Sequence, residues 1–173
     1  MRLILERGDL TQAAVDAIVN AANSGMLGGG GVDGAIHRAA GRELVEACRQ
    51  FKRVEGVRCP PGEARITPGF ALKARFVIHT VGPVYARDPD PAGTLRRAHL
   101  SSLALANEQG LRSVAFPAIS CGVFGYPLDE AAEIALQAAV DGAGQLAEIR
   151  FVLFGPETLE AWTQARQRLF GEG

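Results

Sequence analysis

The sequence predicts an α/β fold with three layers, in which helices cover both faces of a central six-stranded sheet that is mixed but largely parallel. Two observations support this prediction. From the third element onward, short apolar runs alternate with segments of helical periodicity. The chain of 173 residues contains no repeat, linker or low-complexity tract, so we expect a single domain over 1–173. Ligands of such sheets bind beyond the carboxyl ends of the strands.

The N-terminal half is expected to hold four strands and one helical region. Residues 32–50 repeat Ala, Leu and Ile at helical spacing, and Gly41 is expected to break this helix. Runs of strand length stand at 3–5, 17–20, 63–67 and 76–81.

The C-terminal half is expected to alternate helices and strands. Gly110 suits the C-terminal end of the first helix, and Pro156 stands where the start of the last helix tolerates proline. The expected helices are 93–109, 128–140 and 157–169, and the expected strands are 113–118 and 149–154.

Composition argues against several functional classes. A net charge of −1 argues against nucleic acid as the main partner, because phosphate binding normally leaves a basic excess. No apolar run reaches the roughly 18–20 residues of a membrane span, and the first ten residues carry charges too early for a signal peptide. The three cysteines show no CxxC spacing and form no metal-ligand pattern with the three histidines. We therefore expect a cytoplasmic monomer with reduced thiols and neither metal nor cofactor.

Two stretches without a charged residue stand out in a chain that is one-fifth charged: 18–32 and 113–128. Each begins as a strand, passes through glycines and leads into a helix. Residues 28–31 are all glycine, so their backbone can adopt positive φ and approach a ligand closely. Successive N–H groups in such turns bind anions, and the following helix adds its positive end. Residues 120–125 offer the same features, so the two loops suit a diphosphate held without lysine or arginine.

Other motif interpretations fit less well. Gly29, Gly31 and Gly34 match GxGxxG, but about eight residues separate this motif from its strand, which it should follow directly. A P-loop would need GK[ST], which is missing. Ala118 stands where a nucleophile elbow needs its first glycine, and no histidine follows residue 99 to complete a Ser–Asp–His order.

Several motifs, in this order and spacing, resemble the MacroD-type macrodomain family. The resemblance implies that the protein binds ADP-ribose and hydrolyses esters at its distal ribose. It also implies that O-acetyl-ADP-ribose and proteins mono-ADP-ribosylated on acidic side chains are its substrates. The motifs are GDLT (8–11), DAIVNAAN (16–23), GGGGVDGAIHRAAG (28–41), GEARIT (62–67), FVIHTVGP (76–83) and AFPAISCGVFGYP (115–127).

The resemblance also implies a role for each matching residue. Asp9 would accept the adenine amino group, while Leu10, where many members have isoleucine, and Phe154 would pack against the base. Asn20 and Asn23 follow the second strand, and Asn23 would bind the distal ribose. The phosphate loops would be Gly30, Gly31 and Val32, and then Ser120, Gly122, Val123, Phe124 and Gly125.

Phe124 and Cys121 stand apart from the other residues of the second loop. Phe124 would also cover the distal ribose. Cys121 stands where threonine is common, and we expect a small, partly buried thiol that preserves the cradle and is no nucleophile.

Asp33 directly follows the first uncharged stretch and its glycines, at the start of the expected helix. A carboxylate at a helix start also has a purely structural explanation, its attraction to the helix dipole. Beside the glycines and Asn23, and with the family resemblance, we expect Asp33 to be functional. Asn23 and Asp33 would orient the ribose, and Asp33 would position or deprotonate a water, with help from the bound diphosphate.

The histidines and three rival functions stay open. His37, one helical turn after Asp33, either orients that carboxylate or packs the helix. We expect His79 to be a hydrogen-bonded core residue and His99 to lie on a helix surface. The rivals are a non-catalytic ADP-ribose reader, a dinucleotide-dependent oxidoreductase, and an RNA or poly(ADP-ribose)-binding module; Asp33 beside the glycines favours the hydrolase.

Overall fold

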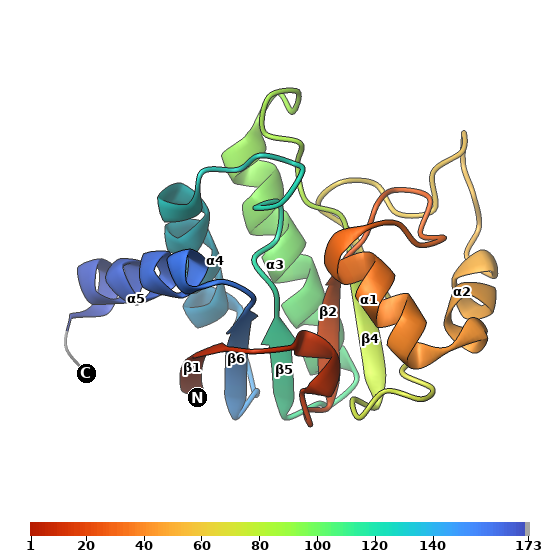
Figure 1. Ribbon diagram of the computed structural model, residues 1–173, viewed down its shortest axis with the longest axis horizontal. Coiled ribbons are helices and arrows are strands. Elements are labelled where there is room, and N and C mark those ends of the chain that lie inside the picture. The colour runs from red at the N-terminus through yellow and green to blue at the C-terminus, as the bar shows by residue number, and fades with distance from the viewer. Residues whose placement is uncertain (172–173) are drawn as a thin grey trace.

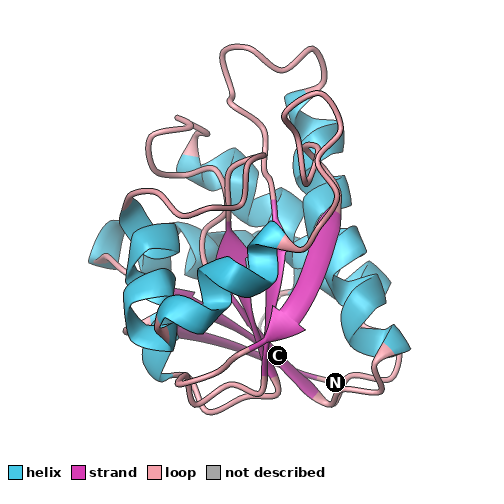
Figure 2. Cartoon of the chain, turned by 90° about the vertical axis from the view of Figure 1, so that its right-hand side faces the viewer, coloured by secondary structure: helices cyan, strands magenta, loops and turns pink. Residues whose placement is uncertain are grey.

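A computed structural model describes residues 1–171 and shows a six-stranded sheet between two layers of helices (Figure 1; Figure 2). The strands are β1 (Arg2–Arg7), β2 (Ala17–Ala21), β3 (Ala64–Pro68), β4 (Phe76–Thr80), β5 (Ser113–Phe116) and β6 (Glu148–Leu153). The helices are the 3₁₀ turn η1 (Leu10–Gln12), α1 (Gly31–Ala40), α2 (Arg42–Arg49), α3 (Pro91–Glu108), α4 (Leu128–Gly142) and α5 (Pro156–Phe170).

The strand order is β1-β6-β5-β2-β4-β3. Every neighbouring pair is parallel except β3 and β4, which are antiparallel. The prediction of a mixed, largely parallel sheet of six strands is therefore confirmed. Within residues 1–171, none of the helices has the length and apolar character that crossing a bilayer requires.

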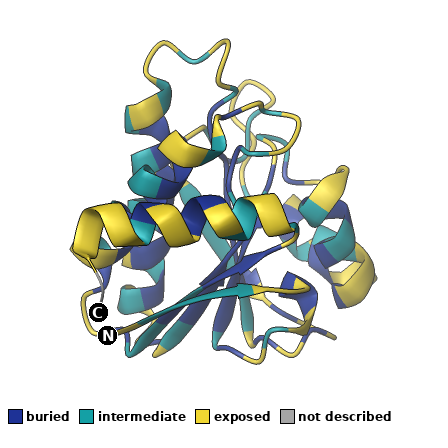
Figure 3. Cartoon of the chain, turned by 60° about the vertical axis from the view of Figure 1, so that its left-hand side comes forward, coloured by how far each residue is buried: buried dark blue, intermediate teal, exposed yellow. Residues whose placement is uncertain are grey.

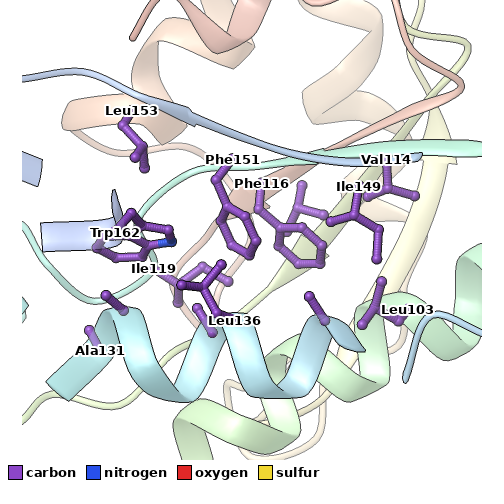
Figure 4. Close-up of a cluster of buried hydrophobic side chains, with 14 of the residues drawn as sticks. Leu103, Val114, Phe116, Ile119, Ala131, Leu136, Ile149, Phe151, Leu153 and Trp162 are labelled. Atoms are coloured by element: carbon purple, nitrogen blue, oxygen red, sulfur yellow. The ribbon is translucent and has the colours of Figure 1, made fainter. Parts of the chain in front are cut away.

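Alternating side chains of the strands build two separate cores, one on each face of the sheet. Ile18 of β2 and Val77 of β4 pack with α1 and α2, whereas Ala17 and Val19 pack with α3, α4 and α5. The larger core contains an aromatic row in which the rings of Phe116 and Phe151 lie 5.4 Å apart (Figure 4). The central strands are buried on both faces, and α5 buries only its inner side (Figure 3).

The predicted helix break at Gly41 is confirmed, because Gly41 separates α1 from α2 with a φ of +92°. Most other boundaries shift by one or two residues, and two of these shifts have a clear physical cause. Helix α3 starts two residues early, at Pro91, because the Asp90 side chain caps it by accepting from the Gly93 amide. Strand β5 ends at Phe116, before Pro117, which has no N–H to give to a neighbouring strand.

The prediction that His99 lies on a helix surface is wrong. His99 is only 1% exposed, and its ring lies 5.3 Å from that of Phe116. Its Nδ1 donates to the Leu95 carbonyl at 2.8 Å, and burial lowers the pKa of His99 to about 4, so the ring is neutral. Helix α3 buries an i, i+3, i+4 stripe to which His99 belongs.

The connections place β2 and β5 at a topological switch point. The two strands are adjacent and parallel, yet α1 after β2 covers one face of the sheet and α4 after β5 covers the other. The loops that follow them therefore part above the sheet, at the upper edge in Figure 1. Open α/β sheets bind their ligands at such points, and these are the two uncharged loops.

Candidate functional site

Two of the four glycines of the first loop adopt the positive φ that the sequence allows. Gly28 and Gly31 have φ angles of +96° and +58°, in the left-handed region. Gly30 is the N-cap of α1 and supplies no side-chain cap. The amides of Val32 and Asp33, in the first helical turn, are therefore left without an intrahelical acceptor.

The second loop also presents unpaired amides. In the described part of the chain, the N–H groups of Gly122, Val123 and Phe124 donate to no protein acceptor. Val123 is fully exposed. The neighbouring amides of Gly125 and Tyr126 are satisfied by the carbonyls of Gly122 and Ser120. Both loops thus present backbone donors of the kind that bind anionic groups.

Ser120 holds the shape of the second loop. It has a φ of +66°, a strained conformation for a residue with a Cβ. Its buried hydroxyl donates to the Pro83 carbonyl at 2.8 Å, which ties the loop to the segment after β4. Gly82 makes room for this contact, since a Cβ there would collide with Ser120 Oγ. The side chain of Ser120 therefore supports the loop, and its backbone shapes the cradle.

Cys121, next to this serine, is a partly buried thiol. Its Sγ lies 3.5 Å from the Ile119 carbonyl. Burial raises the pKa of Cys121 to about 12, so the side chain stays protonated at neutral pH. This environment agrees with the expectation that the Cys121 thiol is no nucleophile.

Asp33 is buried at the start of α1, and its two carboxylate oxygens have different surroundings. Oδ1 accepts from Asn20 Nδ2 at 2.8 Å and lies 3.4 Å from His37 Nε2. Oδ2 has no hydrogen-bond partner among residues 1–171. A Cβ built on Gly29 would lie 3.1 Å from Oδ2 and 3.3 Å from Asn23 Nδ2. The free oxygen of Asp33 and the Asn23 amide therefore flank Gly29.

The side chain of Asn23 makes most of its hydrogen bonds to the backbone of the loop itself. Its Oδ1 accepts from the amides of Gly25 and Met26, at 3.2 and 3.1 Å, and its Nδ2 donates to the Gly28 carbonyl at 3.1 Å. Met26, only 1% exposed, anchors this turn in the core. Because an amide nitrogen has two protons, one remains for a ligand.

Asn20 and His79 form a buried polar pair that the sequence did not reveal. They are register partners on β2 and β4, and Asn20 Nδ2 lies 3.2 Å from His79 Nδ1. On its other side, His79 Nε2 lies 3.0 Å from Thr67 Oγ1 and 3.7 Å from Cys48 Sγ. Burial, helped by nearby His37 and opposed by Asp33, lowers the pKa of His79 to about 3. The imidazole is therefore neutral, and its two nitrogens are bonded as expected for a core histidine.

Three predicted adenine contacts follow the paired strands β1 and β6. Pairing of β1 with β6 brings Asp9 and Phe154 to the same edge, because Gly8 donates to the Leu153 carbonyl at 3.0 Å. Asp9 caps η1 with Oδ1, which accepts from the Thr11 amide at 2.9 Å. Phe154 is 93% exposed, whereas Leu10 is buried in the smaller core.

Asp9 and Phe154 are therefore available to a ligand, and Leu10 can form only the floor beneath it. Within the described residues, no set of three or more His, Cys, Asp or Glu side chains is arranged to hold a metal ion.

The segments that form this site also match a known protein family. Residues 19–135, which include both loops and Asp33, match the family model described as Macro domain. The chain belongs to the macro domain family. This confirms the family resemblance found in the sequence motifs.

Curated macro domain proteins are similar over long stretches. An O-acetyl-ADP-ribose deacetylase of Citrobacter rodentium is 51% identical over 172 residues, which cover 97% of this chain and 94% of the relative. An ADP-ribose glycohydrolase of Mus musculus is 56% identical over 137 residues, 78% of this chain and 41% of that protein. The solved macrodomain of Trypanosoma brucei in complex with ADP-ribose superposes with a TM-score of 0.84 at 42% identity, covering 94% of this chain and 68% of that one.

The contact between Gly82 and Ser120 yields a test of how the loop is held. Gly82→Ala should destabilise the fold by about 1–3 kcal/mol, because the new Cβ would overlap Ser120 Oγ and Ile119 Cγ2. Gly122→Ala is the matched control, since its Cβ would meet nothing within 4 Å, and should change stability by less than about 0.5 kcal/mol. Urea unfolding measures both, and equal stabilities would contradict the close packing of these segments.

Proposed function

We propose that this macro domain binds ADP-ribose and hydrolyses ester bonds to its distal ribose. The substrates would be O-acetyl-ADP-ribose and proteins that carry mono-ADP-ribose on glutamate or aspartate. The observation that carries the proposal is Asp33, a buried carboxylate with one oxygen held by Asn20 and the other free beside Gly29. The names of two relatives, an O-acetyl-ADP-ribose deacetylase and an ADP-ribose glycohydrolase, support a hydrolase that acts on ADP-ribose derivatives.

Binding would follow the layout of the two loops. The diphosphate accepts hydrogen bonds from two groups of free backbone amides. One group lies at the start of α1, together with Gly30 and Gly31, and the other comprises Gly122, Val123 and Phe124. The free Oδ2 of Asp9 accepts the adenine amino group, and Phe154 packs against the base. The distal ribose then lies beside Asn23 and under Phe124.

Hydrolysis would use the free oxygen of Asp33. A water held by Oδ2 attacks the ester carbonyl carbon, and Asp33 orients it or takes its proton. The bond between that carbon and the ribose oxygen breaks, the ribose oxygen takes up the proton that the attacking water loses, and the carboxylic acid leaves. Backbone N–H groups stabilise the negative charge that develops on the carbonyl oxygen, and the diphosphate helps to hold the water. The step requires no covalent intermediate.

The role of Asp33 can be tested by removing its carboxylate. Asp33→Ala should lower kcat for ester hydrolysis by roughly 10²–10⁴ and largely keep the affinity for ADP-ribose, because the amides of the loops remain. Calorimetry measures the affinity, and release of ADP-ribose from a glutamate-modified protein measures turnover. Unchanged turnover in the variant would refute the assignment. Binding without release by the wild type would make the protein a reader.

The space between Asp33 and Asn23 offers a second test. Gly29→Ala places a methyl group 3.1 Å from Asp33 Oδ2 and 3.3 Å from Asn23 Nδ2, where water and ribose would have to fit. We expect kcat to fall roughly 10–100-fold with little change in melting temperature. Wild-type turnover by this variant would show that the reacting groups do not meet at Gly29.

A further inference from the structure

A row of four buried polar side chains crosses three elements to reach Asp33. Thr67 of β3, His79 of β4, Asn20 of β2 and Asp33 of α1 are joined by contacts of 3.0, 3.2 and 2.8 Å in that order. Each of the four is at most 4% exposed. Burying polar groups in an otherwise apolar region costs desolvation free energy. Packing alone therefore does not explain these four side chains.

The chemistry of the four groups determines the direction of every hydrogen bond. The Asp33 carboxylate only accepts, so the amide nitrogen of Asn20 faces it and donates. The second proton of that nitrogen points to His79 Nδ1, which must accept it. The imidazole proton therefore resides on Nε2 and is donated to Thr67 Oγ1. Protonation of His79 would leave no acceptor for Asn20, and burial prevents it by lowering the pKa of His79 to about 3.

Asn20 is costly in this position as a purely structural residue. Its Oδ1 is buried and has no partner among the residues that the structure describes, a loss that an apolar side chain would avoid. In return, the orientation of the Asn20 amide is fixed, because both protons of Nδ2 are hydrogen-bonded, one to Asp33 Oδ1 and one to His79 Nδ1. Rotating the amide by half a turn would set its carbonyl oxygen against Asp33 Oδ1, and the lone pair of His79 Nδ1 opposes the same rotation.

We propose that His79 is a positioning residue for ester hydrolysis, which orients the Asn20 amide so that Asn20 holds Asp33 Oδ1 and leaves Oδ2 to the water. The inference rests on the function proposed above. His79 touches neither the free oxygen nor the glycine loop in these contacts, so it acts through Asn20. Thr67 completes the chain by accepting the Nε2 proton that this tautomer carries.

Two substitutions of His79 separate this role from simple packing. His79→Leu has nearly the same volume and removes the acceptor, whereas His79→Asn is smaller but keeps an oxygen near the position of Nδ1. If packing decides, the asparagine variant should be the worse one. If the acceptor decides, we expect kcat to fall roughly 10–100-fold in His79→Leu and much less in His79→Asn, with the Kd for ADP-ribose within about twofold of the wild type in both.

The full chain is assayed with O-acetyl-ADP-ribose, and ADP-ribose affinity is measured by calorimetry. Turnover by the wild type with an undiminished kcat in His79→Leu, or a lower kcat in His79→Asn than in His79→Leu, would overturn the inference alone. Absence of turnover in the wild type would overturn the proposed function and this inference with it.

A second pair serves if either His79 variant fails to fold. Thr67→Val removes the acceptor of the ring proton at constant volume, and Thr67→Ser restores it. Because Cys48 Sγ lies 3.7 Å from the same nitrogen, we expect a smaller fall in kcat for Thr67→Val, roughly threefold to tenfold, and near wild-type kcat for Thr67→Ser. Equal kcat in the two variants would overturn the inference.

The tautomer itself can be read without any turnover. The titratable groups that face His79 are Asp33 and His37 of α1 and Cys48 of α2. A long-range ¹H–¹⁵N spectrum of the wild type should show His79 as the neutral Nε2–H form from pH 8 down to about 5. A spectrum of the Nδ1–H form, or of an imidazolium at pH 6, would overturn the inference.

Discussion

Unpaired backbone amides at two neighbouring strand ends are the feature on which the rest of the site depends. Strands β2 and β5 lie side by side, but their helices cover opposite faces of the sheet, so the loops part and leave N–H groups without carbonyl partners. Neither loop contains a lysine or arginine. An anion bound there must be held by backbone N–H dipoles and by the start of α1. Such spread-out donors suit a diphosphate, because its negative charge is shared by several oxygens.

The same arrangement explains why a single carboxylate can be placed beside an anion site. Asp33 stands in the first turn of α1, where the helix dipole favours a negative charge. Asn20 and His37 face Oδ1, and the other oxygen is left open. The His79 imidazole, which contacts the amide nitrogen of Asn20, is uncharged. Asn20 thus holds one oxygen of the carboxylate by a hydrogen bond, and the other oxygen is the one that the proposed mechanism assigns to the water.

Sequence reasoning recovered what local patterns encode and missed what depends on pairing at a distance. The strands, the break at Gly41, the positive φ of Gly28 and Gly31, and the position of Asp33 at a helix start all follow from neighbouring residues. The contact between Asn20 and His79 depends on the register of two strands 59 residues apart. The burial of His99 depended on which stripe of α3 faces the sheet, and the repeat of small and apolar residues around it was the signal available.

The most direct measurement is a crystal structure of the protein with ADP-ribose at near-stoichiometric concentration. The diphosphate oxygens should lie within about 3.2 Å of the amide nitrogens of Val32 and Asp33 on one side and of Gly122, Val123 and Phe124 on the other. The distal ribose should lie beside Asp33 Oδ2. A nucleotide bound elsewhere, with these amides facing only solvent, would contradict the central claim.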